Sequence, residues 1–230
     1  MSPANPNNAT PRGGTLSEGE AGYPKKRART RAQLMHAGMI VLARRGPDGA
    51  TVGEIAGEAG VASGTFYNHF PSLIDLVEEI AGQLQMTVEI ASTILDSIEN
   101  DPAIRVAIGS RQLLLLSSED PAGAAAFVSL LAAIPTFRLR IRTVILGTVE
   151  SGIEAGRFDV ASAASATDAV LGAVVQWMRS DLADESGEEQ LDDRVSLLLR
   201  LLGLAKRDVG KTIKAAAVTA AMSTGSQADV

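Results

Sequence analysis

Apolar residues recur at helical spacing through most of the chain, and no stretch shows the period-two alternation that is typical of a half-buried strand. The pattern therefore predicts an all-α protein of about nine helices. Two of these helices are short and lie within residues 51–70. The long helices are expected over residues 30–45, 72–100, 103–118, 121–133, 136–155, 160–183 and 188–206, with most breaks at proline or glycine.

Residues 51–70, with the sequence TVGEIAGEAGVASGTFYNHF, predict two short helices joined by a tight turn. Thr51 and Glu54 have the spacing of a capping box, in which the hydroxyl and the carboxylate each satisfy a backbone N–H group. Gly60 ends the first helix, and Pro71 ends the second because proline cannot donate a backbone hydrogen bond. The apolar residues of the first helix share one face: Val52, Ile55, Ala56 and Ala59. Such a pair is a helix-turn-helix, whose second helix is suited to the major groove of DNA.

The second short helix combines small residues, inward anchors and hydrogen-bonding side chains. Small residues at its start allow the DNA to come close, and the N-terminus of the helix favours an anion. Phe66 and Phe70 are expected to turn inward. The residues expected to contact DNA are Thr51, Ser63, Gly64, Thr65, Tyr67, Asn68 and His69. A hairpin that only caps a core is the alternative, but it would not need Tyr67, Asn68 and His69 exposed in a row.

The same stretch resembles the TetR family of one-component transcriptional regulators. The residues that match at the family's spacing are Thr51, Ile55, Ala56, Ala59-Gly60-Val61, Gly64-Thr65-Phe66-Tyr67 and His69-Phe70. The resemblance is strong over residues 28–80 and covers the rest of the chain only by the layout of helices. Two positions depart from the family's pattern. Ala62 replaces a Ser that caps the second helix in the family, so that Ser63 is expected to cap this helix one residue late. Leu73 replaces a Lys that often binds a DNA phosphate in the family.

The resemblance implies that the helices after residue 72 enclose a cavity for a small ligand, between the fourth and eighth helices. The expected wall residues are apolar and the expected anchors are polar: Phe127, Leu130, Phe137, Trp177 and Met178, with Arg111, Gln112 and Arg138. Ordinary core packing is the alternative for each aromatic residue. The aliphatic composition of this region favours an apolar ligand, and the resemblance transfers no ligand identity.

The helices expected at 160–183 and 188–206 have apolar faces that are wider than one neighbouring helix can cover. The pattern favours a homodimer in which these helices form a four-helix bundle. The expected interface residues are aliphatic: Leu171, Val174, Val175, Leu182, Leu191, Val195, Leu198 and Leu202. The alternative is that both stripes enter the core of the single protomer.

Charge is distributed unevenly along the chain. Residues 25–71 carry seven Lys/Arg against three Asp/Glu, a net charge of +4, although the whole chain carries −6. We expect a basic DNA-binding domain (25–71) followed by an acidic ligand-binding and dimerisation domain (72–206). This distribution fits a protein that contacts DNA phosphates only with its N-terminal part. Residues 1–24 are poor in large apolar side chains and are expected to be a disordered tail. Residues 207–230 are expected to be a C-terminal tail with some helix.

A basic run, KKRARTR, stands directly before the first long helix. Such a run of charged residues is usually a solvent-exposed segment without a specific partner. The alternative is an arm that contacts phosphates or enters the minor groove of DNA. The arm would use Lys25, Lys26, Arg27 and Arg29.

Catalytic and metal chemistry is not indicated by the residues. The chain has no cysteine, and His36 and His69 lie on different predicted helices, so that no metal cluster is expected. Gly210-Lys211-Thr212 lacks the upstream glycine and the preceding strand of a phosphate-binding loop. We therefore expect neither an enzyme nor a resident cofactor.

The predicted function follows from the helix-turn-helix and the resemblance. We expect a homodimeric repressor that binds double-stranded DNA at a palindromic operator and is released by a small, largely apolar ligand. No run of 18 apolar residues and no apolar signal core occur, which predicts a cytoplasmic protein without a membrane span. The alternative is a helical ligand-binding or protein-interaction module with a non-functional DNA-binding head, a function that the loss of Lys at Leu73 would favour.

Overall fold

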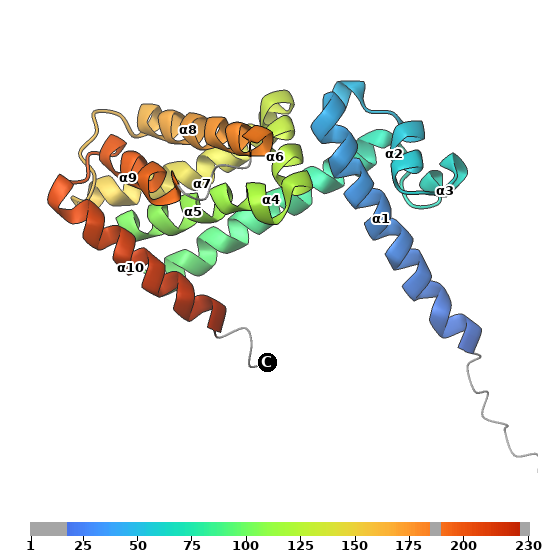
Figure 1. The fold of residues 1–230 in the computed structure, drawn as a ribbon, viewed down its shortest axis with the longest axis horizontal. Helices are drawn as coiled ribbons and strands as arrows, with labels where there is room; N and C mark the ends of the chain where they lie inside the picture. Colours follow the sequence, from blue (N-terminus) through green and yellow to red (C-terminus); the bar gives the residue numbers. More distant parts are fainter. Residues whose placement is uncertain (1–17, 185–189, 226–230) are drawn as a thin grey trace, which may run out of the picture.

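The computed structural model describes the backbone of residues 18–184 and 190–225, and this part of the chain contains helices and turns but no strand (Figure 1). We call α1–α3 the head and α4–α10 the body. The helices are α1 (Glu18–Gly49), α2 (Val52–Glu58), α3 (Ser63–Tyr67), α4 (Leu73–Ile98), α5 (Pro102–Glu119), α6 (Pro121–Ala133), α7 (Pro135–Glu154), α8 (Ala163–Asp184), α9 (Leu191–Leu201) and α10 (Lys206–Gly225). The all-α prediction is confirmed, with one helix more than expected in the described ranges.

The first helix begins earlier than the sequence predicted. It starts at Glu18 instead of Thr30, so that residues 18–24, expected to be disordered, are helical, whereas residues 1–17 lie outside the described residues. Gly46 has φ of 70° and ψ of 170° and kinks α1 near its end. Because glycine adopts positive φ without a steric penalty, the straight part of α1 ends at Gly46 as predicted.

The head is held together by the inward face of α1 and its close approach to α4. Helical spacing places Leu34, Ala37, Val41 and Leu42 on one side of α1, and all four are buried. At Gly38 an added Cβ would lie 2.8 Å from the Ile80 side chain and 2.9 Å from that of Leu76. The missing side chain of Gly38 therefore lets α1 and α4 pack closely, which fixes the start of α4 to the head.

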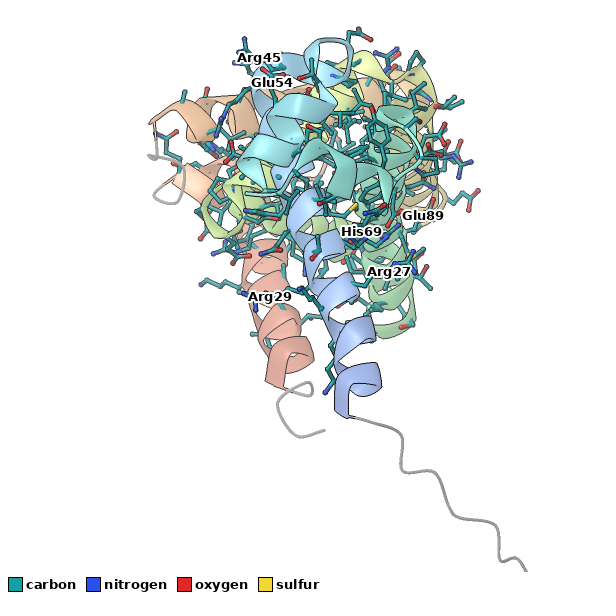
Figure 2. All side chains as sticks on the ribbon, turned by 90° about the vertical axis from the view of Figure 1, so that its right-hand side faces the viewer. Arg27, Arg29, Arg45, Glu54, His69 and Glu89 are labelled. Carbon is teal, nitrogen blue, oxygen red and sulfur yellow. The ribbon has the colours of Figure 1, made fainter. Side chains whose placement is uncertain are left out.

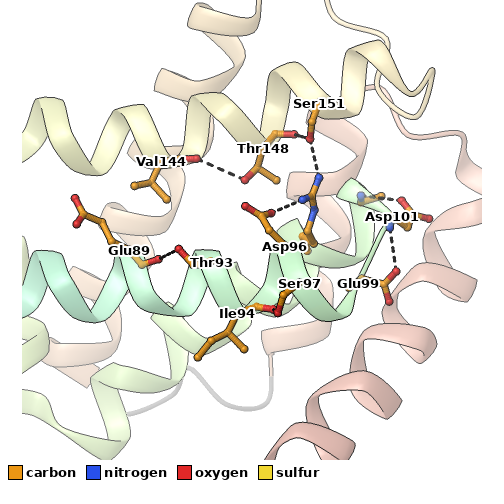
Figure 3. Close-up of polar contacts among 12 residues, drawn as sticks. Glu89, Thr93, Ile94, Asp96, Ser97, Glu99, Asp101, Val144, Thr148 and Ser151 are labelled. Carbon is orange, nitrogen blue, oxygen red and sulfur yellow. Dashed lines mark hydrogen bonds and ion pairs between the residues drawn. The ribbon is translucent and has the colours of Figure 1, made fainter.

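Helix α4 runs from the head into the body (Figure 1). Ser72 caps its start, where the hydroxyl accepts a hydrogen bond from the Asp75 N–H at 3.3 Å. Near its other end, Arg105 of α5 pairs with Asp96 of α4 and donates to the Ser151 hydroxyl of α7 at 2.7 Å (Figure 3). One end of α4 thus packs against the head, and the other is tied to two helices of the body.

The body has an apolar core between α5, α6, α7 and α8. Its largest buried side chains include Phe127, Leu130, Ile141 and Met178. The rings of Phe127 and Phe137 pack edge to face with centroids 5.6 Å apart. Helix α6 also touches the head, because the Ser129 hydroxyl donates to the carbonyl oxygen of Leu42 in α1 at 3.0 Å.

The C-terminal part differs from the single helix predicted over residues 188–206. Helix α9 ends before Gly203, whose φ of 79° reverses the chain. A Cβ at Gly203 would lie 2.2 Å from the carbonyl oxygen of Asp159, and the Asp159 N–H donates to the carbonyl oxygen of Leu202 at 3.1 Å. Residues 206–225 then form α10, which packs on α5, so that most of the expected C-terminal tail is helical.

A buried ion pair links α8 and α9. Two Asp181 carboxylate oxygens lie 2.8 and 2.6 Å from one terminal nitrogen of Arg194, and both side chains are buried. The Arg194 guanidinium also lies 5.7 Å from the centroid of the Trp177 ring. Removing either charge would leave the other buried and unpaired, which is strongly destabilising.

In the described ranges, no single helix is long and apolar enough to cross a membrane. Helices α5 and α6 meet that criterion only as a pair, and the pair is bent by 119° at the break between them.

Candidate nucleic-acid interface

Helix α2 is anchored by two buried residues, Ile55 and Ala56. The predicted capping box at its start forms only in part. The Thr51 hydroxyl accepts from the Glu54 N–H at 3.2 Å, as expected. The Glu54 carboxylate, however, accepts from the Thr51 hydroxyl at 2.9 Å and lies 3.2 Å from Arg45 of α1. A guanidinium offers a stronger charge-assisted partner than a neutral N–H, so that the second half of the box gives way to an ion pair.

Helix α3 is shorter than predicted and begins without a side-chain cap. Ala62 is the N-cap, with φ of −69° and ψ of 148°, and Ser63 is already the first helical residue. The prediction that Ser63 caps one residue late is therefore wrong, because only a residue in extended geometry before the helix can turn its hydroxyl back to the free N–H groups. Asn68 and His69 follow the last helical residue instead of lying within the helix.

Buried phenylalanines hold α3 against the head. Phe66 and Phe70 are almost completely buried, with ring centroids 5.6 Å apart. Tyr67 meets Phe66 edge-on, yet 58% of its surface is exposed. Ser63, Gly64 and Asn68 are exposed, whereas Thr65 and His69 are half-buried. The outer side of α3 therefore presents hydroxyl, amide and phenol groups, as predicted. The expectation that His69 is exposed beside Tyr67 and Asn68 is wrong, because its ring is half-buried.

Two glycines that sequence analysis did not single out lie on the exposed side of α2. A Cβ at Gly53 or at Gly57 would meet no atom within 4 Å. Their spacing of four residues, which places them on one side of a helix, is the signal that could have found them. Together with exposed Thr51, the two glycines leave space for a DNA backbone to come close to α2.

The basic residues of the head fall into two groups. Arg31, Arg44 and Arg45 pair with Glu79, Glu58 and Glu54, respectively, and Arg31 also lies 4.7 Å from the centroid of the Phe70 ring. The residues predicted for a DNA-contacting arm are exposed and make no ion pair with any side chain that the structure describes: Lys25, Lys26, Arg27 and Arg29. They form part of α1 instead of an extended arm, because the helix continues back to Glu18.

His69 lies beside this basic group. Figure 2 shows His69 and Arg27 on one side of α1 and Arg29 on the other. The Nδ1 atom of His69 is buried and has no hydrogen-bond partner among the described residues. Burial lowers the pKa of His69 below its ordinary value of 6.5, and the positive charges of Arg27 and Arg31 lower it further. The lowered pKa favours the neutral form of the imidazole.

Two hollows lie where the head meets the body. The first, which we call the α4–α7 hollow, has a volume of about 670 Å³ and lies between α4, the start of α7 and the turn at Pro47 and Asp48. The second, of about 660 Å³, lies between the end of α1, α6 and α8. Of the residues predicted to bind a ligand, only Phe137 lines either hollow.

The other predicted ligand residues have different roles. Phe127, Leu130 and Met178 are fully buried in the core of the body. Trp177 is half-buried against Arg194. The polar anchors are corrected as well: Gln112 and Arg138 are exposed because the phase of their helices turns them outward, and Arg111 pairs with Asp192 of α9.

The predicted dimer residues are mostly core residues of the single protomer. Six of them are buried, so that their assignment to an interface is wrong: Leu171, Val174, Leu191, Val195, Leu198 and Leu202. Val175 and Leu182 are half-buried. The apolar face of α9 is wide because it packs against α10 as well as against α5 and α8. Helix α10 was not among the predicted helices. On the outer side of α9, 53% of Leu197 and 42% of Leu201 are exposed.

Family models match both parts of the chain. Residues 34–80 match the model described as bacterial regulatory proteins of the tetR family, and residues 101–214 match the model of a tetracyclin repressor-like C-terminal domain. Together these stretches cover more than two thirds of the chain. Among curated proteins, none matches the sequence.

Solved structures share the fold along nearly their whole length. RolR (NCGL1110) in complex with resorcinol is 27% identical, with a TM-score of 0.59 over 83% of this chain and 95% of RolR. A gamma-butyrolactone receptor described as ArpA-like has a TM-score of 0.68 at 18% identity, over 84% of this chain and 97% of the receptor. CprB from S. coelicolor A3(2) has a TM-score of 0.66 at 19% identity, over 84% and 98%. Since both family models match in order along one chain, and the helix-turn-helix lies within the first, the protein belongs to the TetR family of bacterial transcriptional regulators.

Proposed function

We propose that the protein is a homodimeric repressor that holds an inverted-repeat operator and releases it when a small ligand binds the body. The observation that carries this proposal is the outer side of α3. There Ser63, Gly64 and Tyr67 are exposed on a helix that buried Phe66 anchors from behind, and Asn68 is exposed directly after its last residue. Hydrogen-bonding side chains on a rigid short helix are what direct readout of base edges requires.

Sequence-independent contacts come from α1. Lys25, Lys26, Arg27 and Arg29 have no acidic partner among the described side chains, so that they are available for phosphates. Phosphate contacts fix the position of a protein on the duplex, whereas base contacts specify the sequence. A division of labour follows, in which α1 supplies affinity and α3 supplies specificity. A protein with this function works in the cytoplasm, where bacterial DNA lies.

A second copy is needed to read an inverted repeat. Leu197 and Leu201 give α9 an exposed apolar edge next to the largely small and polar outer side of α8. A two-fold dimer through this region would carry two heads, whose α3 helices would enter successive major grooves about 34–36 Å apart or a multiple of that distance.

The ligand acts through α4, which begins at the head and ends in the body. The protein exchanges between a conformation that binds DNA and one that does not. A ligand that binds the second conformation more tightly shifts the population toward it and so releases the operator. A tenfold shift requires about 1.4 kcal/mol of differential binding, which a small organic molecule can supply. Resorcinol bound to RolR, at 27% identity, supports a ligand of that size.

The test is fluorescence anisotropy with duplexes taken from upstream of the protein's own and neighbouring genes. We expect one duplex to bind far more tightly than a scrambled control of equal length. Raising salt from 50 to 200 mM should weaken binding roughly ten- to a thousandfold if a handful of phosphates are contacted. If no duplex binds better than the scrambled control, the proposal fails and the function as a ligand-binding module with an inactive head takes its place.

A further inference from the structure

The α4–α7 hollow joins the two parts of the molecule. One side of it comes from the head end of α4 and the turn after the Gly46 kink, through Leu73 and Asp48. The opposite side comes from α7 of the body, through Phe137 and Arg140. At about 670 Å³ it lies within the range of small-molecule sites. A molecule held there would contact head and body at once.

The hollow is lined by apolar side chains and by more acidic than basic residues. Leu73, Val77 and Phe137 are among the apolar lining residues. The charged lining residues are three acids and one base: Asp48, Glu78, Glu89 and Arg140. All four are exposed, and none makes an ion pair with another described side chain; the Glu89 carboxylate accepts only from Gln85, at 2.6 Å. The hollow therefore combines a largely apolar lining with a net negative charge.

Leu73 and Gly82 affect the charge and the space of the hollow, whose one basic lining residue is Arg140. Leu73 stands where the family often has a Lys, and its half-buried side chain lines the hollow. A Lys there would add positive charge at the head end of the hollow. Gly82 lines the same wall, and a Cβ added to it would meet no atom within 4 Å. Glycine weakens a helix interior, so that the empty space at Gly82 is not explained by the stability of α4.

We propose that the α4–α7 hollow binds an organic cation with an apolar body, in contact with both the head and the body of the protein. The apolar part would leave water against the walls formed by α4 and α7, and the net negative charge of the lining residues would favour a cation. An anion of the same shape would meet a net repulsive field. This site differs from the predicted cavity inside the body and does not depend on the proposed function.

The test uses two rigid ions of nearly the same shape and opposite charge, tetraphenylphosphonium and tetraphenylborate. Each is titrated into the full-length protein by isothermal calorimetry at low salt. We expect saturable binding of the phosphonium, at least tenfold tighter than binding of the borate, and weaker binding as salt screens the acidic side chains. Equal affinity for both ions would mean that the apolar surface alone binds and would overturn the proposal, as would no saturable binding of the phosphonium.

Variants locate the site. Gly82→Leu places a side chain in the hollow and should abolish phosphonium binding, whereas Gly147→Leu, on an exposed and equally open position of α7, should leave it unchanged. Leu73→Lys should weaken binding about tenfold, and Leu73→Met should retain it. Circular dichroism checks that each variant is folded. Unchanged binding in both Gly82→Leu and Leu73→Lys would place the cation elsewhere and refute the assignment. Operator binding is measured separately, so that failure of the repressor proposal leaves this result intact.

Discussion

Neighbouring residues of α3 show how the helix is divided between stability and recognition. Phe66 is fully buried, whereas Tyr67, the next residue, is 58% exposed although its ring contacts that of Phe66. The two positions point to different sides because successive residues on a helix are about 100° apart. Substitutions at these two positions should therefore affect different properties of the protein.

Tyr67→Ala should weaken operator binding by about 1–3 kcal/mol, the usual range for losing one base-directed contact. Because most of the side chain is exposed, helical content and thermal stability should stay near those of the unchanged protein. Phe66→Ala is the matched control and should lower the free energy of unfolding by about 3–5 kcal/mol, since it empties a buried site. Anisotropy and thermal melts separate the two effects. Full operator affinity in Tyr67→Ala would remove this residue from the interface.

His69 should make the stability of the head depend on pH. Its pKa in the folded protein lies below 6.5, through burial and the charges of Arg27 and Arg31, so that the unfolded chain binds a proton more readily. Stability is then unaffected by His69 at pH 8 and falls as pH drops through about 6.5. In thermal melts between pH 8 and 5.5, His69→Gln should lose less stability on acidification than the unchanged protein. His36→Gln, at an exposed position, is the control and should behave like the unchanged protein.

At this scale, burial could be predicted from sequence, whereas polar partners could not. Helical periodicity placed Leu34 and Leu42 inside correctly, because phase alone decides which side of α1 faces the head. The partner of Glu54 was predicted to be the backbone N–H of the cap residue Thr51, but it includes Arg45 of α1. Such a pair depends on how two helices approach in space, and the local spacing of residues does not contain that information.

Helix α3 lacks a side-chain cap at its N-terminus, and a substitution can supply one. Ala62→Ser should add the missing side-chain acceptor at the N-cap, where the backbone is already extended. We expect the head to be stabilised by about 1 kcal/mol, measured as a higher midpoint in urea unfolding. Ala169→Ser, at an exposed position inside α8, is the control and should give no gain. A gain of equal size in both variants would point to a general effect of serine instead of capping.

Helix boundaries were predictable where proline marks them and less so elsewhere. Pro102, Pro121 and Pro135 each begin a helix within one residue of the expected start. The break between α9 and α10 was missed, because Gly203 lies within an apolar run and its positive φ is set by contact with Asp159. Because α10 was not predicted, the apolar residues of α9 that it helps to bury were assigned to a dimer interface.

For the whole molecule, adjacent leucines on α9 distinguish folding from association. Leu198→Glu would bury an unpaired carboxylate at a fully buried position and should unfold the protomer. Leu197→Glu, at a position that is 53% exposed, should preserve helical content but shift a dimer toward monomer. Light scattering at micromolar concentration combined with circular dichroism makes the comparison. A Leu197→Glu protein that remains fully dimeric would exclude this edge of α9 from the interface.

The projecting first half of α1 has a consequence for proteolysis. This segment leaves the head as a single helix (Figure 1), and isolated helices of about 12–15 residues or fewer are only marginally stable in water. Its exposed basic residues are cleavage sites for trypsin: Lys25, Lys26, Arg27 and Arg29. Brief digestion of the free protein should therefore cut first in this segment. Operator DNA should slow that cut relative to scrambled DNA, because phosphates would hold the segment in its helical form. Equal cutting rates with both duplexes would mean that α1 takes no part in specific binding.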